Sequence, residues 1–203
     1  MSEAAPVAIV FPGQGAQRAG MARDFFDASR HARDVFAEAS EATSLDLAAL
    51  CFGDDPRLDL TEYTQPAIVT AELAMLRALE AELGLRGMYF GGHSLGEYAA
   101  LCAAGALPLA DAVRLTRRRG ALMQAAVPAG AGAMVAVIAE GIADRDLDEL
   151  GADVDLANRN APDQIVLSGP ADAILRASVQ LAAILAGVEH RIVPLNVSAP
   201  FHS

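Results

Sequence analysis

The chain has 203 residues, 53% of them hydrophobic, which is enough to build a sizeable core in one domain or two small ones. Its formal net charge of −11 argues against nucleic acid and anionic membrane as partners, and no apolar run approaches the roughly 18–20 residues of a membrane span. There is no basic region ahead of an apolar one at the start and no Cys/His spacing for zinc, so we expect a cytoplasmic protein without metal or disulfide.

The first part of the chain reads as alternating strand and helix. "VAIVF" (Val7–Phe11) is a short apolar run that stops at the glycine turn "PGQGAQ", which is typical of a buried parallel strand. A second short strand is expected at "GMYFGG", residues 87–92. The expected helices span, in order, Met21–Leu50, Thr64–Gly84, residues 96–107 and residues 108–126.

The pattern changes near Pro128, where "PAGAG" reads as a hinge. The elements expected after it are a strand at 133–139, a short helix at 144–150, strands at 153–158 and 163–169, a helix at 171–187 and a strand at 189–195. The order β-α-β-β-α-β is that of a ferredoxin-like unit. We therefore predict an α/β fold: an α/β-hydrolase-like main body with a parallel sheet, residues 1–129, and an inserted ferredoxin-like subdomain, residues 130–197.

The chain returns to the main body at residues 198–203 and ends there, at "NVSAPFHS". A main body that carries an inserted unit needs chain after the return to finish its sheet. We therefore expect the sequence to be cut short at its C-terminus.

Ser94 is the first candidate for chemistry. "GHSLG" (Gly92–Gly96) matches the G-x-S-x-G pattern between a predicted strand and a predicted helix. Such a turn lifts a serine hydroxyl out at the top of a sheet, and the amide of Leu95 at the helix start can then face an oxyanion. The alternative is that small residues merely allow a tight turn.

A nucleophilic serine needs a base, and the sequence holds four histidines. His31 lies among charged residues and is expected to be exposed. His93 should point away from its neighbour Ser94 and support the turn. His202, at the return to the main body, is favoured only modestly over His190, which lies in a predicted strand of the subdomain.

Arg119 stands out among the four arginines of the helix at 108–126. Arg114, Arg117 and Arg118 share a face that is expected to be solvated, whereas Arg119 neighbours apolar residues at helical spacing. A cation in that position needs an anion partner. The partner is either an acidic side chain in a structural salt bridge or the carboxylate of a substrate.

Together, "FPGQGAQ", "TQPA", "GHSLGEYAAL", "RRRGALMQAA" and "SAPFH" resemble, in order and spacing, the family of malonyl-CoA:acyl carrier protein transacylases and polyketide synthase acyltransferases. The resemblance covers the whole chain. It implies a ping-pong acyltransferase without bound cofactor, in which Ser94 takes a malonyl group from malonyl-CoA and passes it to the phosphopantetheine thiol of an acyl carrier protein.

The same resemblance assigns roles to single residues. It implies that His202 is the base, that Arg119 binds the substrate carboxylate, and that the amides of Gln14 and Leu95 form the oxyanion hole. Phe201 matches the position that favours malonyl over methylmalonyl. Family members continue some 80–90 residues past the histidine.

The predicted partners are malonyl-CoA and an acyl carrier protein, which a monomer would bind through local arginines, the candidates being Arg114, Arg117, Arg118, Arg176 and Arg191. Two alternatives stay open. One is a serine hydrolase or thioesterase of the α/β-hydrolase class, and the other is a catalytically impaired module that docks carrier protein.

Overall fold

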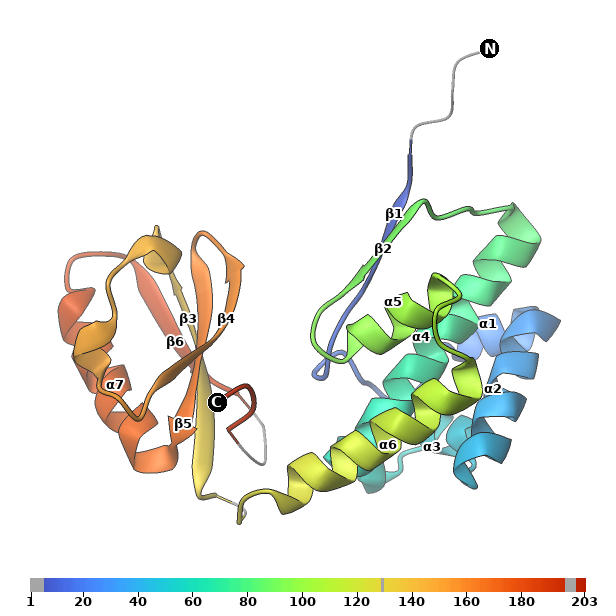
Figure 1. Ribbon diagram of the computed structural model, residues 1–203, viewed down its shortest axis with the longest axis horizontal. Coiled ribbons are helices and arrows are strands. Elements are labelled where there is room, and N and C mark those ends of the chain that lie inside the picture. Colours follow the sequence, from blue (N-terminus) through green and yellow to red (C-terminus); the bar gives the residue numbers. More distant parts are fainter. Residues whose placement is uncertain (1–5, 129, 196–199) are drawn as a thin grey trace. The chain divides into compact units, whose positions relative to one another are not determined.

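The chain folds into two compact units, Met1–Leu122 and Met123–Ser203, each with its own apolar core. The computed structural model describes residues 6–128, 130–195 and 200–203 (Figure 1). The prediction of an α/β fold with one parallel sheet is confirmed, and the second sheet is antiparallel.

The parallel sheet of the first unit has two strands, β1 (Ala8–Phe11) and β2 (Tyr89–Gly92), which lie side by side in Figure 1. Their register runs from Ala8 opposite Tyr89 to Phe11 opposite Gly92. Because side chains alternate along a strand, Phe11 is buried while Val10 is 76% exposed. The sheet therefore has one face packed on the unit and one face open.

Helices make up the rest of the first unit. Serines divide the stretch that was expected to be helical from Met21 to Leu50: Ser29 caps the second helix with its side chain, and Ser44 takes a left-handed conformation at the end of it. The elements are α1 (Arg23–Ala28), α2 (Arg30–Thr43), α3 (Leu47–Phe52), the 3-10 turn η1 (Pro56–Asp59), α4 (Thr61–Leu83), α5 (Gly96–Ala103) and α6 (Leu109–Ala125).

Helix α4 is the central element, and most of its side chains are buried. It begins at Thr61, three residues before the predicted start, because the carbonyl of Leu60 already accepts hydrogen bonds from the amides of Tyr63 and Thr64. Pro66 consequently lies inside the helix instead of near its first turn. Gly84 ends the helix, as predicted, and takes the left-handed conformation there.

The second unit has a four-stranded antiparallel sheet in the order β4-β5-β3-β6. Its elements are β3 (Gly132–Ala139), β4 (Asp155–Ala161), β5 (Gln164–Pro170), α7 (Ala171–Ile184) and β6 (His190–Pro194), with two 3-10 turns, η2 (Ile142–Asp144) and η3 (Asp148–Leu150), between β3 and β4.

The strand side chains of this unit divide between two clusters. Val135 and Val137 of β3 join the core shared with Ile174 and Leu181 of α7. Met134 and Ala136 point to the opposite face. The helix expected at residues 144–150 is wrong: only 3-10 turns form there, because an aspartate-rich segment of that length has weak helix propensity.

Candidate active site

Ser94 lies on a sharp turn between β2 and α5. Its φ of 50° is in the left-handed region, an uncommon conformation for a residue other than glycine. Gly92 and Gly96 make the turn possible, because a Cβ on Gly92 would overlap the backbone of Gly96 and one on Gly96 would overlap the backbone of Phe11. The strand–turn–helix context predicted for Ser94 is thus confirmed.

Two backbone amides lie near this turn. Leu95 is fully buried and directly precedes α5, so its amide stands at a helix N-terminus. Gln14 belongs to the loop after β1, and this loop lies against the turn: a Cβ on Gly13 would come within 2.7 Å of the His93 carbonyl oxygen. Neither amide donates a hydrogen bond to another described residue. Both have the hydrogen-bonding capacity that an oxyanion hole requires.

Arg119 reaches the serine from α6. Its Nη2 donates to Ser94 Oγ at 3.2 Å, and its Nη1 donates to the Gln65 side-chain oxygen at 2.9 Å. Its Cζ lies 5.9 Å from the centroid of the Tyr98 ring. A guanidinium has five N–H groups, and the remaining three meet no acceptor among the described residues. No ion pair in the described part of the chain includes Arg119, so the salt-bridge alternative finds no support there.

The arginine approaches the serine because α6 packs very closely on α4. Gly120, the next residue, has no side chain, and a Cβ in its place would lie 2.8 Å from Glu62 Cα and 2.9 Å from the Thr61 carbonyl carbon. This contact brings the start of α4 and the middle of α6 together. Arg119 is thereby held at the edge of the interface, half-buried and directed at Ser94.

The apolar surroundings predicted for Arg119 are only partly present. Leu115 and Leu122, its helical neighbours, are 50% and 54% exposed, so the side of α6 that was expected to be buried is open. The buried residues of α6 are Ala112, Val113, Thr116 and Gly120, which lie beside Arg119 and not around it. Arg119 does differ from the other arginines of α6. The difference lies in its hydrogen bonds to Gln65 and Ser94 and not in an apolar environment.

The solvated face predicted for the other arginines is confirmed for Arg114 and Arg118, which are exposed, and is wrong for Arg117, which is half-buried. Arg114 Nε donates to the Ala42 carbonyl at 3.2 Å, and Arg117 donates to the Thr43 carbonyl and pairs with Glu62 at 3.5 Å. Both side chains bind the C-terminal carbonyls of α2, which need partners. Arg118 is exposed and has no hydrogen bond or ion pair in the described part of the chain.

A row of hydrogen bonds connects Arg119 to the loop after β1. Gln65 of α4 accepts from Arg119 and donates its amide to the Gln14 side-chain oxygen at 3.3 Å. Gln14 in turn donates to Thr61 Oγ1 at 3.2 Å. Sequence reasoning missed Gln65, Tyr98 and Thr61. A signal existed for Gln65: a glutamine inside an apolar helix must be buried and therefore needs polar partners.

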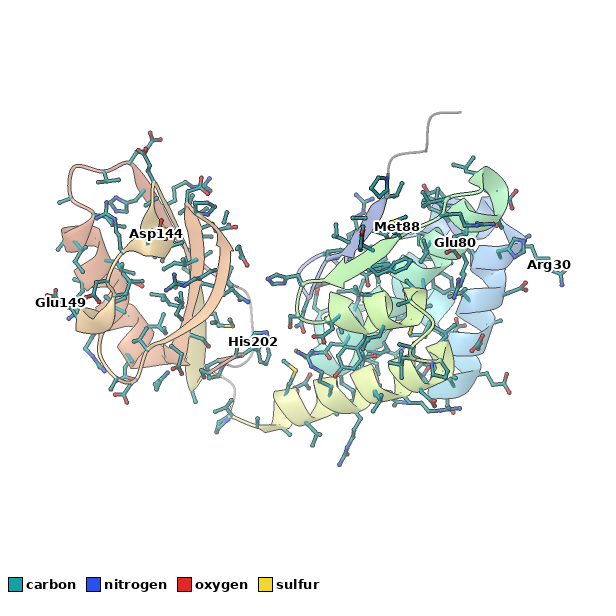
Figure 2. The ribbon with its side chains drawn as sticks, turned by 45° about the horizontal axis from the view of Figure 1, so that its top comes forward. Arg30, Glu80, Met88, Asp144, Glu149 and His202 are labelled. Carbon is teal, nitrogen blue, oxygen red and sulfur yellow. The ribbon has the colours of Figure 1, made fainter. Side chains whose placement is uncertain are left out.

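The two predicted residues of the C-terminal segment lie in the second unit. Phe201 is half-buried and packs against the cluster formed by Met134, Ala136 and Val166. His202 is exposed with a φ of 60° and is labelled in Figure 2. Ser94 belongs to the other unit, so the pairing of Ser94 with His202 stays a prediction.

The other three histidines differ in their hydrogen bonds and in their surroundings. His31 is exposed, as predicted, and His190 places its Nδ1 2.8 Å from the Val188 carbonyl at the start of β6. His93 follows β2, where its amide donates to the Phe11 carbonyl at 3.0 Å and its ring lies beside Gly13. His93 thus supports the turn, as expected.

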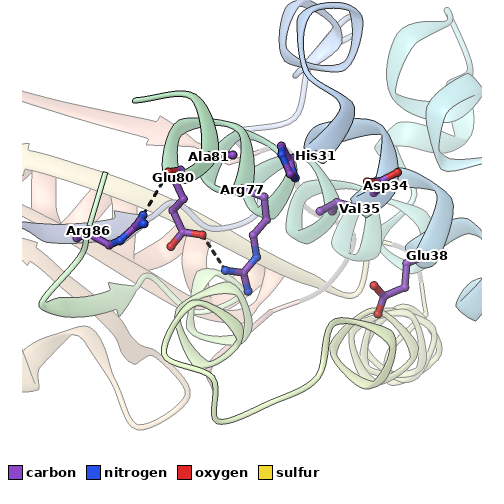
Figure 3. A pocket seen from close by; sticks show the side chains of 8 residues that line it. All are labelled: His31, Asp34, Val35, Glu38, Arg77, Glu80, Ala81 and Arg86. Carbon is purple, nitrogen blue, oxygen red and sulfur yellow. Dashed lines mark hydrogen bonds and ion pairs between the residues drawn. The ribbon is translucent and has the colours of Figure 1, made fainter. Parts of the chain in front are cut away.

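A cavity of about 550 Å³ lies between α2 and α4, away from Ser94 (Figure 3). His31 is on its rim, and Arg77 pairs there with Glu80 at 2.7 Å. Arg86 donates to the Glu80 carbonyl at 3.2 Å. The described residues that line this cavity include no serine or cysteine nucleophile, so it offers no site comparable to that of Ser94. Among the described residues no group of three or more potential metal ligands occurs, and every helix is too short or too polar to cross a membrane.

Comparison with known proteins gives matches over nearly the whole chain. Residues 8–203 match the family model described as acyl transferase domain. The chain is 43% identical to the malonyl CoA-acyl carrier protein transacylase of Bacillus subtilis over 97% of its own length and 63% of that relative's length, and 43% identical to that of Escherichia coli K12 over 96% and 64%.

Solved structures of malonyl transacylases also match the chain. The malonyl CoA-acyl carrier protein transacylase of Clostridium perfringens matches with a TM-score of 0.86 and 42% identity, over 98% of this chain and 63% of the other. A malonyl-transacylase in complex with its type II PKS acyl-carrier protein matches with a TM-score of 0.87 and 40% identity, over 97% and 64%. The chain thus spans a little less than two thirds of these relatives.

Proposed function

The chain belongs to the acyl transferase domain family, and from that membership we propose that it moves a malonyl group from malonyl-CoA to the phosphopantetheine thiol of an acyl carrier protein. The observation that carries this proposal is the hydrogen bond between the Arg119 guanidinium and Ser94. A serine hydroxyl on a nucleophile turn with a cation beside it suits an acyl donor that has its own carboxylate.

The first half-reaction loads the serine. Ser94 Oγ attacks the thioester carbonyl of malonyl-CoA while His202 accepts the hydroxyl proton, as the resemblance to the family implies. The tetrahedral intermediate collapses with cleavage of the carbon–sulfur bond, and the proton passes to the CoA thiolate. The product is a malonyl ester on Ser94.

The second half-reaction transfers the malonyl group from Ser94 to the carrier protein. The carrier protein's phosphopantetheine thiol loses its proton to His202 and attacks the ester carbonyl. The Ser94 oxygen leaves and regains a proton from His202. In both halves the amides of Gln14 and Leu95 would stabilise the oxyanion, and losing one such donor typically costs ~10²–10³ in rate.

Arg119 would bind the malonyl carboxylate with the N–H groups that Gln65 and Ser94 leave unused. A carboxylate held there fixes the acyl group on the serine and leaves little room for water. This is the feature that separates a transferase from a simple esterase with the same serine turn.

Phe201 is proposed to exclude branched extenders. Its ring would crowd the α-methyl group of methylmalonyl, an effect of roughly 1–3 kcal/mol. We expect a higher kcat/KM for malonyl-CoA than for methylmalonyl-CoA and a smaller difference in Phe201→Ser. Equal kcat/KM values for the two donors with the unaltered chain would contradict the assignment.

The finer description of the fold is also proposed. The strand order β4-β5-β3-β6 with α7 across one face supports a ferredoxin-like subdomain at residues 130–197. Residues 1–129 would then form an α/β-hydrolase-like main body. The predicted return of residues 198–203 to it stays a proposal, because residues 198 and 199 lie outside the described residues and residues 200–203 belong to the second unit. The chain is expected to serve fatty-acid or polyketide synthesis in the cytoplasm.

The carrier protein would meet fewer basic groups than the sequence suggests. Arg114 and Arg117 are used by the end of α2, and Arg176 pairs with Asp172 at 2.7 Å. Arg118 and Arg191 stay as candidates for an acidic carrier. The similarity to a malonyl-transacylase that was solved in complex with its acyl-carrier protein supports such a partner for this chain.

The test is to incubate the 203-residue chain with malonyl-CoA and to follow its intact mass. A malonyl adduct that is absent in Ser94→Ala, and that is discharged by a phosphopantetheinylated carrier protein, supports the transferase. Discharge by water at the same rate without carrier identifies a hydrolase instead. A folded chain that forms no adduct supports the docking module instead.

A further inference from the structure

Arg119 has more contacts than the binding of a carboxylate requires. Two of them come from residues that neither attack the thioester nor stabilise its oxyanion: Gln65 of α4, 2.9 Å from Nη1, and Tyr98 of α5, whose ring centroid is 5.9 Å from Cζ. A flexible arginine side chain has several rotatable bonds, so its guanidinium must be held from more than one direction to keep one orientation.

The two contacts restrict different rotations of the Arg119 guanidinium. Gln65 accepts a hydrogen bond in the plane of the guanidinium and so limits its rotation within that plane. Tyr98 presents an aromatic ring to the cation, which is attracted to the electron-rich face and limits the tilt. The contact between Nη2 and Ser94 Oγ at 3.2 Å is the third constraint, and it orients the cation relative to the nucleophile.

Gln65 is itself held firmly. It is fully buried, and its amide nitrogen donates to the Gln14 side chain at 3.3 Å, which is anchored on Thr61 at 3.2 Å. Its orientation is set by this row of hydrogen bonds, since the amide can offer its oxygen to Arg119 only if its nitrogen faces Gln14. The side chain of Gln65 therefore links Arg119 to the loop that carries the Gln14 amide.

We propose that Gln65 and Tyr98 are positioning residues that orient Arg119, and that they thereby set the preference for acyl donors that carry a carboxylate. The proposal deepens the function proposed above and rests on it. It follows that damage to either residue lowers the reaction of malonyl donors more than that of acetyl donors, because an acetyl group has no carboxylate for Arg119 to bind.

The experiment measures the initial rate of acylation of Ser94 by malonyl-CoA and by acetyl-CoA, with intact mass as the readout. Gln65→Leu keeps the volume but removes the acceptor, and Tyr98→Leu removes the ring. We expect the malonyl-to-acetyl ratio to fall roughly tenfold to a hundredfold in Gln65→Leu, as for a lost hydrogen bond to a charged group, and about threefold to tenfold in Tyr98→Leu.

Two further variants separate positioning from general damage. Tyr98→Phe retains the ring face and should restore the ratio that Tyr98→Leu loses. Tyr63→Leu is the matched control, because the Tyr63 ring contacts a different arginine, Arg57, at 5.5 Å and should leave the ratio unchanged. A parallel loss of both donors' rates in Gln65→Leu and Tyr98→Leu, with a constant ratio, would mean a merely structural role and overturn the proposal.

A second measurement keeps this proposal distinct from the proposed function. If the unaltered chain is acylated by neither donor, the transferase assignment fails, and the binding of free malonate and acetate is then compared by the thermal shift that each produces. Malonate stabilisation that is lost in Gln65→Leu and Arg119→Ala supports the positioning role. Equal stabilisation of Gln65→Leu and the unaltered chain, or none in either, would refute it.

Discussion

Glu72 is a carboxylic acid in the apolar interior of α4. It is 5% exposed, and neither of its carboxyl oxygens has a hydrogen-bond partner among the described residues. Burial raises its pKa from the ordinary 4.5 to about 8, because the charged form loses its hydration. Glu72 is therefore mostly protonated in the folded chain at neutral pH.

This shift predicts how stability depends on pH. Between pH 4.5 and 8 the unfolded chain has lost the Glu72 proton while the folded chain retains it, so the free energy of unfolding falls as pH rises, by up to about 1.4 kcal/mol per pH unit. Above pH 8 the contribution is flat. Glu72→Gln cannot ionise and should become progressively more stable than the unaltered chain across this window.

Urea denaturation at several pH values measures the difference. Glu41→Gln, at an exposed position of α2, serves as the control and should not change the slope. If the stability difference between Glu72→Gln and the unaltered chain is the same at pH 5 and pH 8, then Glu72 is not a buried acid in solution.

At the scale of elements, α2 is held to α6 by arginines. Arg117 binds the Thr43 carbonyl at the end of α2 and pairs with Glu62 of α4. Arg117→Met keeps the length of the side chain but leaves a helix carbonyl without its donor, which should lower the free energy of unfolding by about 1–2 kcal/mol. Arg118→Met, one residue on and exposed, should change it by less than about 0.5 kcal/mol. Similar losses in both variants, measured by urea unfolding, would exclude this role for Arg117.

The contact between α4 and α6 depends on Gly120. Replacing a glycine inside a helix by alanine ordinarily stabilises it by about 0.5–1 kcal/mol. Here the new Cβ would press on the backbone of Thr61 and Glu62, and backbone cannot give way easily. Gly120→Ala should therefore destabilise the first unit by roughly 1–3 kcal/mol. Unchanged or higher stability of Gly120→Ala in thermal unfolding would show that α4 and α6 leave room for a methyl group at this contact.

For the whole molecule, the open face of the parallel sheet is the main liability. Val10 and Tyr89 are 76% and 62% exposed on that face, and Met88 next to them is 63% exposed (Figure 2). Parallel sheets are normally covered on both faces, and an exposed apolar patch promotes association. The 203-residue chain should therefore bind the dye ANS and self-associate.

The double variant Val10→Thr/Tyr89→Lys should bind less ANS and elute later in size-exclusion chromatography. Leu175→Lys is the control, because it removes an equally exposed apolar side chain from α7 in the second unit. If the double variant and the control have equal effects, the sheet face is not the surface responsible.

Local sequence pattern was sufficient to place the strands β1, β2, β3, β5 and β6, the helices α5, α6 and α7 and the Ser94 turn. The reason is that apolar periodicity, glycine spacing and helix stop signals act over a few residues. The pattern treated α1, α2 and α3 as one helical stretch and began α4 three residues late. The same reasoning failed at residues 144–150, where propensity was too weak to specify a helix, and at Arg117, whose partner lies on a helix 74 residues away in sequence.

Arg119 shows where tertiary structure became necessary. The sequence already marked it as a cation that needs a partner, but its apolar helical neighbours Leu115 and Leu122 proved to be exposed. Only the packing of Gly120 on α4 decided that the guanidinium meets Gln65, Ser94 and Tyr98, because these residues come from three different elements. Short-range pattern selects residue types and local turns. Which side chains meet depends on how closely two backbones approach, and that distance is a property of the folded unit.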